Sequence, residues 1–241
     1  MSENICSYIS ISDDALLSMV LNGMEAFVVG HIRNNKLNRR YTSETGGSIW
    51  GTKNKLKNNS VLYHINTIST DTSARTDTDS YDPTDEVYLL KNDIISSYWP
   101  EKEFFGDFHT HPFKNISYQE IEKEKNFEFS EQDRLSTQND DLFNENNGLC
   151  YQIGLVLTMC TMQRVSSSDP KYINDSCIRF DMGNYRMWLK AYIYNRNKKI
   201  FTDEHLYLEC HRLMGQNGQY LDFGKGVKKS SNSTIVHKTV I

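Results

Sequence analysis

The chain has 241 residues, a formal net charge of −4 and a hydrophobic fraction of 38%. This length suits one domain with insertions, and 14 Tyr, 11 Phe and 3 Trp supply enough apolar bulk for a core. The slightly acidic balance excludes the basic face that is typical of nucleic-acid-binding proteins. No stretch reaches the roughly 18 apolar residues of a membrane span, and the first twenty residues lack the pattern of a secretory signal, so we expect no membrane association.

The cysteines predict a reducing compartment. There are five of them, an odd number, and they are widely spaced without a Cys-x-x-Cys pair. We therefore expect reduced thiols that mostly fill the core of a cytoplasmic protein. A cysteine peptidase built on Cys150 or Cys177 has no supporting context in the sequence.

The first half of the chain is expected to contain two helices and two strands. Ser12, followed by two acids, is typical of a helix start, and this helix should end near Asn22 and Gly23. A strand is then predicted over 24–32, with Glu25 near its start. The further predictions are a polar, turn-rich stretch at 34–59, a strand at 61–65, a mobile loop at 67–84 that is rich in Thr, Asp and Ser, and a helix over 85–98.

The second half adds the strands of a mixed sheet. Strands are predicted over 104–111, 152–159, 187–194 and 206–210, with a helix after Ser130. We therefore predict an α/β fold: one domain over 1–224, with a mixed, curved β-sheet flanked by helices. The small polar tail 225–241 should be disordered.

The stretch from Phe104 to Pro112 carries the strongest chemical signal. An apolar strand ending in His109-Thr110-His111 presents two imidazoles on one face, because strand side chains repeat every two residues. Pro112 should end the strand, where binding sites are usually built. With Asp133 from the following helix, two histidines and a carboxylate make three ligands of a catalytic zinc site whose fourth position is open.

These elements together resemble the JAMM metalloproteases of the JAB/MPN fold, a family of zinc-dependent deubiquitinases and other isopeptidases. The family pattern is an early strand glutamate, then His-x-His-Pro after an apolar strand, then Ser-x-x-Asp. Here the resemblance assigns Glu25 to the glutamate, His109 and His111 to the pair, and Ser130 and Asp133 to the last element.

The resemblance implies how each residue works. Glu25 would act as a general base that takes a proton from the attacking water and passes it to the leaving amine. Ser130, three residues before Asp133, would bring its hydroxyl to the oxyanion of the tetrahedral intermediate. The implied substrate is an amide or isopeptide bond after the extended C-terminal tail of a ubiquitin-like protein. The abundant Asn and Lys favour a bacterial setting, in which JAMM proteins occur beside ubiquitin-like modifiers and their activating and conjugating enzymes in antiphage defence.

A second serine-acid pair competes for the third ligand. Ser117-Tyr118-Gln119-Glu120 lies nearer to the usual family spacing, but it offers glutamate where the family uses aspartate. Asp133 is preferred because Phe129 before Ser130 also matches the family context. This assignment makes 112–129 an insertion beside the site, and we expect it to form a flap.

Three other interpretations stay open. Asp107-x-His109-x-His111 also resembles the Asp-x-His-x-His start of metal-dependent phosphoesterases and amidohydrolases, although a β/α barrel does not fit the remaining length well. The chain could instead be a non-catalytic MPN-type scaffold, which would be expected to have lost the histidines or the aspartate. Finally, Ser130-x-x-Asp133 is also an ordinary capping box at a helix start.

Overall fold

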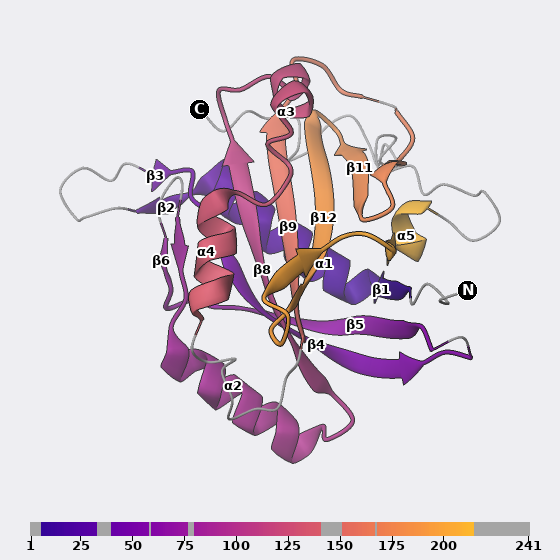
Figure 1. Ribbon diagram of the computed structural model, residues 1–241. Helices are drawn as coiled ribbons and strands as arrows, with labels where there is room; N and C mark the ends of the chain where they lie inside the picture. The colour runs from indigo at the N-terminus through magenta and orange to yellow at the C-terminus, as the bar shows by residue number, and fades with distance from the viewer. Residues whose placement is uncertain are drawn as a thin grey trace.

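The computed structural model describes residues 6–32, 40–57, 59–76, 80–140, 151–166 and 168–214. The predicted mixed α/β fold is confirmed: a curled sheet of ten strands is flanked by helices (Figure 1). Its order is β10-β11-β12-β9-β8-β4-β5-β1-β14, with β13 beside β12. The strands are β1 (Ser7–Ile11), β4 (Gly46–Lys55), β5 (Val61–Thr70), β8 (Glu103–Phe113), β9 (Tyr151–Thr161), β10 (Lys171–Asn174), β11 (Cys177–Met182), β12 (Tyr185–Asn195), β13 (Ile200–Thr202) and β14 (Leu206–Glu209).

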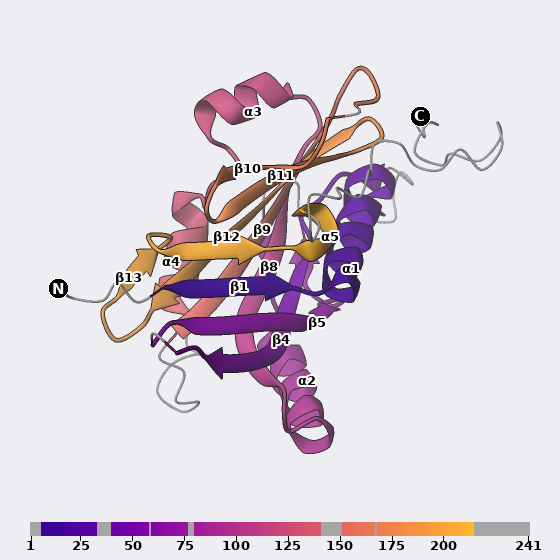
Figure 2. The same cartoon turned by 90° about the vertical axis from the view of Figure 1, so that its right-hand side faces the viewer.

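Helices cover both faces of this sheet (Figure 2). The helices are α1 (Asp13–Met24), the π-helical turn η1 (Glu25–Val29), α2 (Asp85–Tyr98), α3 (Tyr118–Glu124), α4 (Glu131–Asn139) and α5 (His211–Met214). Helix α1 buries its apolar side in the main core, on the inner face of the curl. Separate smaller clusters join α2, α3 and the segment before α4 to the outer face. The candidate site lies on this outer face.

A bulge in β8 determines which of its side chains face the outer side. The pairing of β4 with β8 shifts between Ile49, which lies opposite Gly106, and Trp50, which lies opposite Phe104, so that Phe105 is the extra residue. Phe104 therefore packs against α2 on the outer face and Phe105 in the main core, and the outward alternation resumes at Asp107. Without this change of phase, the histidines of β8 would face the core.

Gly106 cannot accept a side chain. Its φ is +147°, and a Cβ atom there would lie 2.0 Å from the carbonyl oxygen of Ile153. We expect Gly106→Ala to lower the free energy of unfolding by about 2 kcal/mol or more. Gly23→Ala is the matched control, because its Cβ would meet only side-chain atoms at 3.1 Å or beyond and alanine favours the helix. Urea unfolding of both variants measures the difference, and equal midpoints would contradict the role of the bulge.

The structure corrects three predictions in the first half of the chain. The predicted strand over 24–32 is wrong: α1 continues through Met24 into η1, and only His31–Ile32 (β2) pairs, with Arg40–Tyr41 (β3). The stretch 34–59, expected to be turn-rich, contains the ten-residue strand β4.

The segment 67–84, predicted as a loop, is partly regular. Strand β5 continues to Thr70, and Arg75–Thr76 (β6) pairs with Tyr81–Asp82 (β7). Asp71 closes the base of this hairpin, because its carboxylate accepts hydrogen bonds from the backbone N–H groups of Ser73 and Thr84 at 3.0 and 2.9 Å.

Most of the remaining predictions of helices and strands are confirmed. Helices over 85–98 and after Ser130 are confirmed, as are the strands predicted at 61–65, 104–111, 152–159, 187–194 and 206–210, with small changes of bounds. Strand β8 does not end before Pro112 but continues to Phe113, paired with β9. The tail 225–241 lies outside the described residues.

Candidate metal centre

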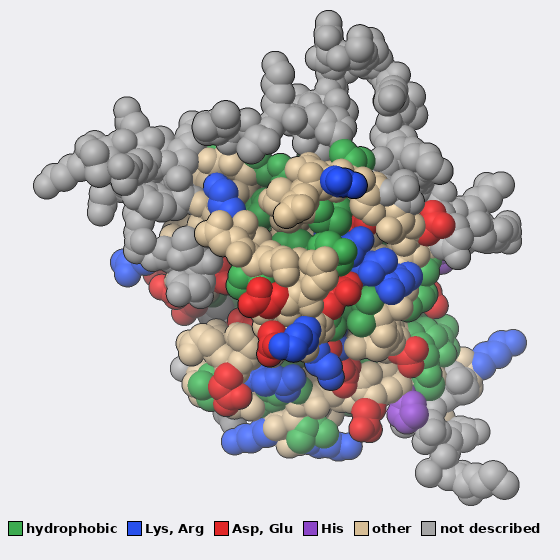
Figure 3. Space-filling model, turned by 90° about the horizontal axis from the view of Figure 1, so that it is seen from above, with side chains coloured by type: hydrophobic (Ala, Val, Ile, Leu, Met, Phe, Trp, Pro, Cys, Tyr) green, Lys and Arg blue, Asp and Glu red, His purple; other side chains and the backbone are tan. Residues whose placement is uncertain are grey.

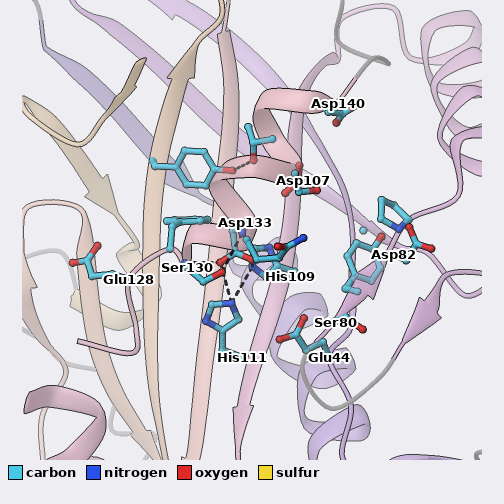
Figure 4. Close-up of a pocket in the computed structure, with 18 of the residues that line it drawn as sticks. Glu44, Ser80, Asp82, Asp107, His109, His111, Glu128, Ser130, Asp133 and Asp140 are labelled. Carbon is cyan, nitrogen blue, oxygen red and sulfur yellow. Dashed lines mark hydrogen bonds and ion pairs between the residues drawn. The ribbon is translucent and has the colours of Figure 1, made fainter. Parts of the chain in front are cut away.

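Strand β8 and helix α4 bring together three side chains predicted as metal ligands. His109 and His111 are buried on the outer face of β8, and Asp133 reaches them from the first turn of α4 (Figure 4). His109 Nε2 lies 3.2 Å from Asp133 Oδ1, and His111 Nε2 lies 3.3 Å from Asp133 Oδ2. The two Nε2 atoms are 3.2 Å apart. Within the described residues, these three form the cluster of His, Cys, Asp and Glu ligand atoms that could hold a metal ion.

The donor set and its dimensions fit a zinc ion. Zinc takes imidazole nitrogen and carboxylate oxygen at about 2.0–2.2 Å, so neighbouring ligand atoms of a tetrahedral ion lie about 3.3 Å apart. The three contacts among His109, His111 and Asp133 have this length. Three protein ligands leave a fourth position for water or substrate, which is typical of catalytic sites.

The Ser130-x-x-Asp133 pair is both a helix cap and part of this site. Ser130 Oγ accepts a hydrogen bond from the Asp133 N–H at 3.1 Å, and Asp133 Oδ2 accepts one from the Ser130 N–H at 2.7 Å. This capping box begins α4 and fixes the orientation of the carboxylate. Because the Ser130 oxygen accepts the backbone bond, its own O–H can donate into the pocket that Ser130 lines.

The charges of His109 and Asp133 stabilise each other in the metal-free protein. Burial raises the pKa of Asp133, but hydrogen bonds from His109 and His111 outweigh burial and hold that pKa well below its ordinary value of 3.8. Burial lowers the pKa of His109, but the hydrogen bond and charge of Asp133, with Asp107 and Glu44 nearby, raise it above 6.5 overall. At moderately acid pH, protonated His109 and the Asp133 carboxylate therefore form an ion pair that stabilises the site without a metal ion.

These shifts predict a pH-dependent effect of zinc. The raised pKa of His109 stabilises the metal-free fold below about pH 6.5, and this contribution is lost as the pH rises through the folded value. Zinc requires neutral imidazoles, so its binding strengthens over the same range. We expect the difference in melting temperature between zinc-loaded and chelator-treated protein to widen from pH 6 to pH 8. A constant difference over this range would contradict the site.

The structure does not bring Glu25 to the site. Glu25 begins η1, its side chain is exposed, and it is absent from the residues that line the pocket around the histidines. Its assignment depended on a strand that does not form. The assignment of Glu25 as the general base is therefore wrong in position.

Glu44 occupies the place that Glu25 was expected to take. It lines the pocket beside His109 and His111, and its charge is one of those that raise the pKa of His109 (Figure 4). Its backbone position is set by Thr45, whose N–H donates to Thr110 Oγ1 at 3.0 Å and whose carbonyl accepts from the Thr110 N–H at 2.9 Å. Glu44 is not one of the clustered ligand residues, as expected for a base that acts on water and not on the metal.

The competing ligand Glu120 is excluded by its position. Ser117 caps α3 in the same way that Ser130 caps α4, but Glu120 is exposed and does not line the pocket. The serine-acid spacing is thus a capping pattern at both helices. Only the second one places its acid against the histidines.

The insertion 112–129 forms a packed wall and not a free flap. Ile121 and Phe127 are buried, with Phe127 stacked on Trp188 at 6.3 Å. Arg179 pairs with Glu122 at 3.2 Å. The end of this segment, from Glu124 to Phe129, lines the pocket.

On the face viewed from above in Figure 3, basic and acidic side chains are interspersed, without a basic patch.

The pocket is large and acidic. Its volume is about 930 Å³. Seven of the lining residues are acids and one is a lysine; they are Glu44, Asp82, Asp107, Glu124, Glu128, Asp133, Asp140 and Lys125. Aromatic rings of α2, β7, β8 and β12 form part of the walls. Such a lining favours a neutral or cationic substrate over an anionic one.

The buried thiols of Cys160 and Cys177 are not nucleophiles. Burial raises the pKa of Cys177 and of Cys160 to about 12, so neither forms a thiolate near neutral pH. Neither lines the pocket. Cys150 lies outside the described residues.

Comparisons with known proteins leave the family open. No protein-family model and no curated protein matches this chain. Among solved structures, the Trichoplax adhaerens STIL N-terminal domain matches with 10% identity and a TM-score of 0.31, over 77% of this chain and 41% of that one. This chain thus spans less than half of that structure, and so distant a likeness carries no argument. Across the described ranges, no helix is long and apolar enough to span a membrane.

Proposed function

We propose that this chain is a metal-dependent peptidase of the JAMM type, which hydrolyses the amide or isopeptide bond after the C-terminal tail of a ubiquitin-like protein. The observation that carries the proposal is the convergence of His109, His111 and Asp133 in one pocket, with Glu44 beside them but outside the ligand cluster. Two imidazoles, one carboxylate, a separate glutamate and a serine are the groups that such hydrolysis requires.

The residues divide the work as follows. His109, His111 and Asp133 would hold zinc, which supplies polarisation of the scissile carbonyl and a lowered pKa for a water molecule. Glu44 takes the proton of the attacking water and delivers it to the departing amine. Ser130 donates a hydrogen bond from its hydroxyl to the carbonyl oxygen as negative charge develops there. The capping box orients both Ser130 and Asp133, so the first turn of α4 positions a metal ligand and a hydrogen-bond donor to the substrate.

Two observations favour a peptidase over the phosphoesterase or amidohydrolase alternative. That alternative requires Asp107 as a ligand, yet the Asp107 carboxylate accepts a hydrogen bond from Gln152 at 2.9 Å and is not in the ligand cluster. The acids of the pocket outside the ligand set would also disfavour a phosphate group. Retention of the complete ligand set, together with Glu44, speaks against a non-catalytic scaffold.

The substrate and setting follow from the same resemblance. The partner would be a ubiquitin-like protein or its conjugate, and activating and conjugating enzymes of a bacterial antiphage system would act beside it. The acidic pocket supports a tail that carries basic side chains near the scissile bond.

The test uses purified protein supplied with zinc and a ubiquitin-like protein joined by an amide bond at its C-terminus. We expect cleavage directly after the tail, measured by intact mass, and complete inhibition by a chelator. A parallel incubation with a phosphate monoester tests the alternative. Zinc-dependent release of phosphate without amide cleavage would overturn the proposal.

A further inference from the structure

Helix α4 carries the ligand Asp133 but has almost no apolar anchor of its own. Of its residues, only Thr137 is buried, and Leu135 is 43% exposed. A helix of nine residues is not stable by itself, so its position must be set by contacts from outside. The placement of the ligand therefore depends on what holds the ends of α4.

Two neighbouring outer-face residues of β12 contact α4 and the segment before it. Tyr192 meets Thr137, with their hydroxyl oxygens 2.7 Å apart, and its ring packs against Phe129 at 3.7 Å. Lys190, two residues earlier on the same face, contacts Glu128. The ring of Phe129 also lies 6.0 Å from that of His109. The segment before α4 therefore contacts the histidine strand β8 as well as leading into the helix that carries Asp133.

Lys190 is a buried cation whose three donors are all used. Only 1% of the residue is exposed. Its Nζ lies 3.0 Å from Glu128 Oε2, 2.8 Å from Asp203 Oδ2 and 3.0 Å from Ser176 Oγ. An ammonium group has three N–H donors, so this arrangement is saturated and has one preferred geometry. Glu128 is thereby fixed two residues before the cap of α4.

We infer that Lys190 is a positioning residue for the metal centre: by holding Glu128, it sets the place of Ser130 and hence of the Asp133 carboxylate relative to His109 and His111. This inference rests on the proposed metal site. Residues that orient metal ligands from outside the ligand set commonly change metal affinity by 10- to 100-fold. Lys190 lies beyond the ligands and does not line the metal pocket, so it acts only through the segment that it holds.

The test is the metal affinity of Lys190→Met. Methionine keeps the buried volume, but it leaves the carboxylates of Glu128 and Asp203 without their cation, so some loss of stability is expected. We expect zinc affinity about tenfold weaker and an altered absorption spectrum of bound Co²⁺, together with a lowered urea midpoint. Arg186→Met is the matched control, because Arg186 is a buried outer-face residue of β12 whose partner Asp181 lies at 2.8 Å, away from α4.

A second variant separates positioning from loss of structure. Glu128→Gln alters only the partly exposed partner, and we expect it to weaken metal binding as Lys190→Met does, with no further loss in the double variant. Wild-type affinity and spectrum in Lys190→Met would overturn the inference alone. A loss of affinity that Arg186→Met shows to the same extent would also overturn it. A wild-type protein that binds no metal would overturn the proposed function and this inference together.

Discussion

Replacing Glu44 by glutamine should lower the rate of amide hydrolysis by about 10²- to 10⁴-fold, while zinc stays bound. Glutamine keeps the size and polarity of the side chain but cannot accept the proton of the attacking water. Glu44 lines the pocket and lies outside the ligand cluster, so its loss should leave the metal ligands in place. The measurement is kcat on a ubiquitin-like amide substrate, with zinc content determined on the same samples.

Glu25→Gln is the matched control for this prediction. It makes the same chemical change at an exposed glutamate of η1 that does not line the pocket. We expect wild-type turnover from it. Loss of activity in Glu25→Gln with activity retained in Glu44→Gln would show that the positions of the two glutamates have been interpreted wrongly.

Removing the carboxylate of Asp133 should abolish metal binding and activity together. Asp133→Ala leaves two imidazoles, and it also breaks the capping box because the Ser130 N–H loses its partner. Loss of the cap alone costs about 0.5–2 kcal/mol, so the fold should survive. Isothermal titration with zinc measures the effect, which we expect to exceed a hundredfold loss of affinity.

Glu120→Ala is the control for Asp133→Ala. Glu120 sits at the equivalent position of α3, three residues after Ser117, but is exposed and outside the pocket. It should bind zinc as the wild type does. Retention of zinc in Asp133→Ala and its loss in Glu120→Ala would transfer the third ligand to α3.

Local patterns predicted the pair of histidines and two candidate acids, and the family resemblance favoured Asp133 over Glu120. His109 and His111 share a face because of the two-residue period of a strand, and Asp133 follows a serine at capping distance. Neither pattern depends on contacts distant in the sequence. What the pattern could not supply was the phase of the strand, which depends on the bulge at Phe105 and on the close approach of Gly106 to β9.

Glu44 was missed because the start of β4 has the composition of a turn. It is followed by Thr45, Gly46, Gly47 and Ser48, which favour turns when taken alone. In the fold, a Cβ on Gly47 would lie 2.2 Å from the Ser69 carbonyl oxygen, so glycine is needed there for close strand packing. An acid two residues before a glycine pair that opens a strand was the signal available.

Glu25 was misplaced because the residues after it have the composition of a strand but continue a helix. The apolar run after it, Ala26 to Val29, favours a strand by composition. In the fold, Ala26 and Phe27 are buried as a continuation of α1, with the Phe27 ring 5.9 Å from that of Tyr185. Packing against the core thus decides the conformation of a short apolar run that local preference leaves ambiguous.

The central claim is that His109, His111 and Asp133 hold a metal ion. The most direct test is the zinc content of purified wild-type protein after equilibration with zinc and removal of the excess at pH 7.5. We predict about one zinc per chain, displaced by Co²⁺ with the absorption of a four-coordinate nitrogen-oxygen site. Protein that retains no metal under these conditions, although folded, would contradict the account.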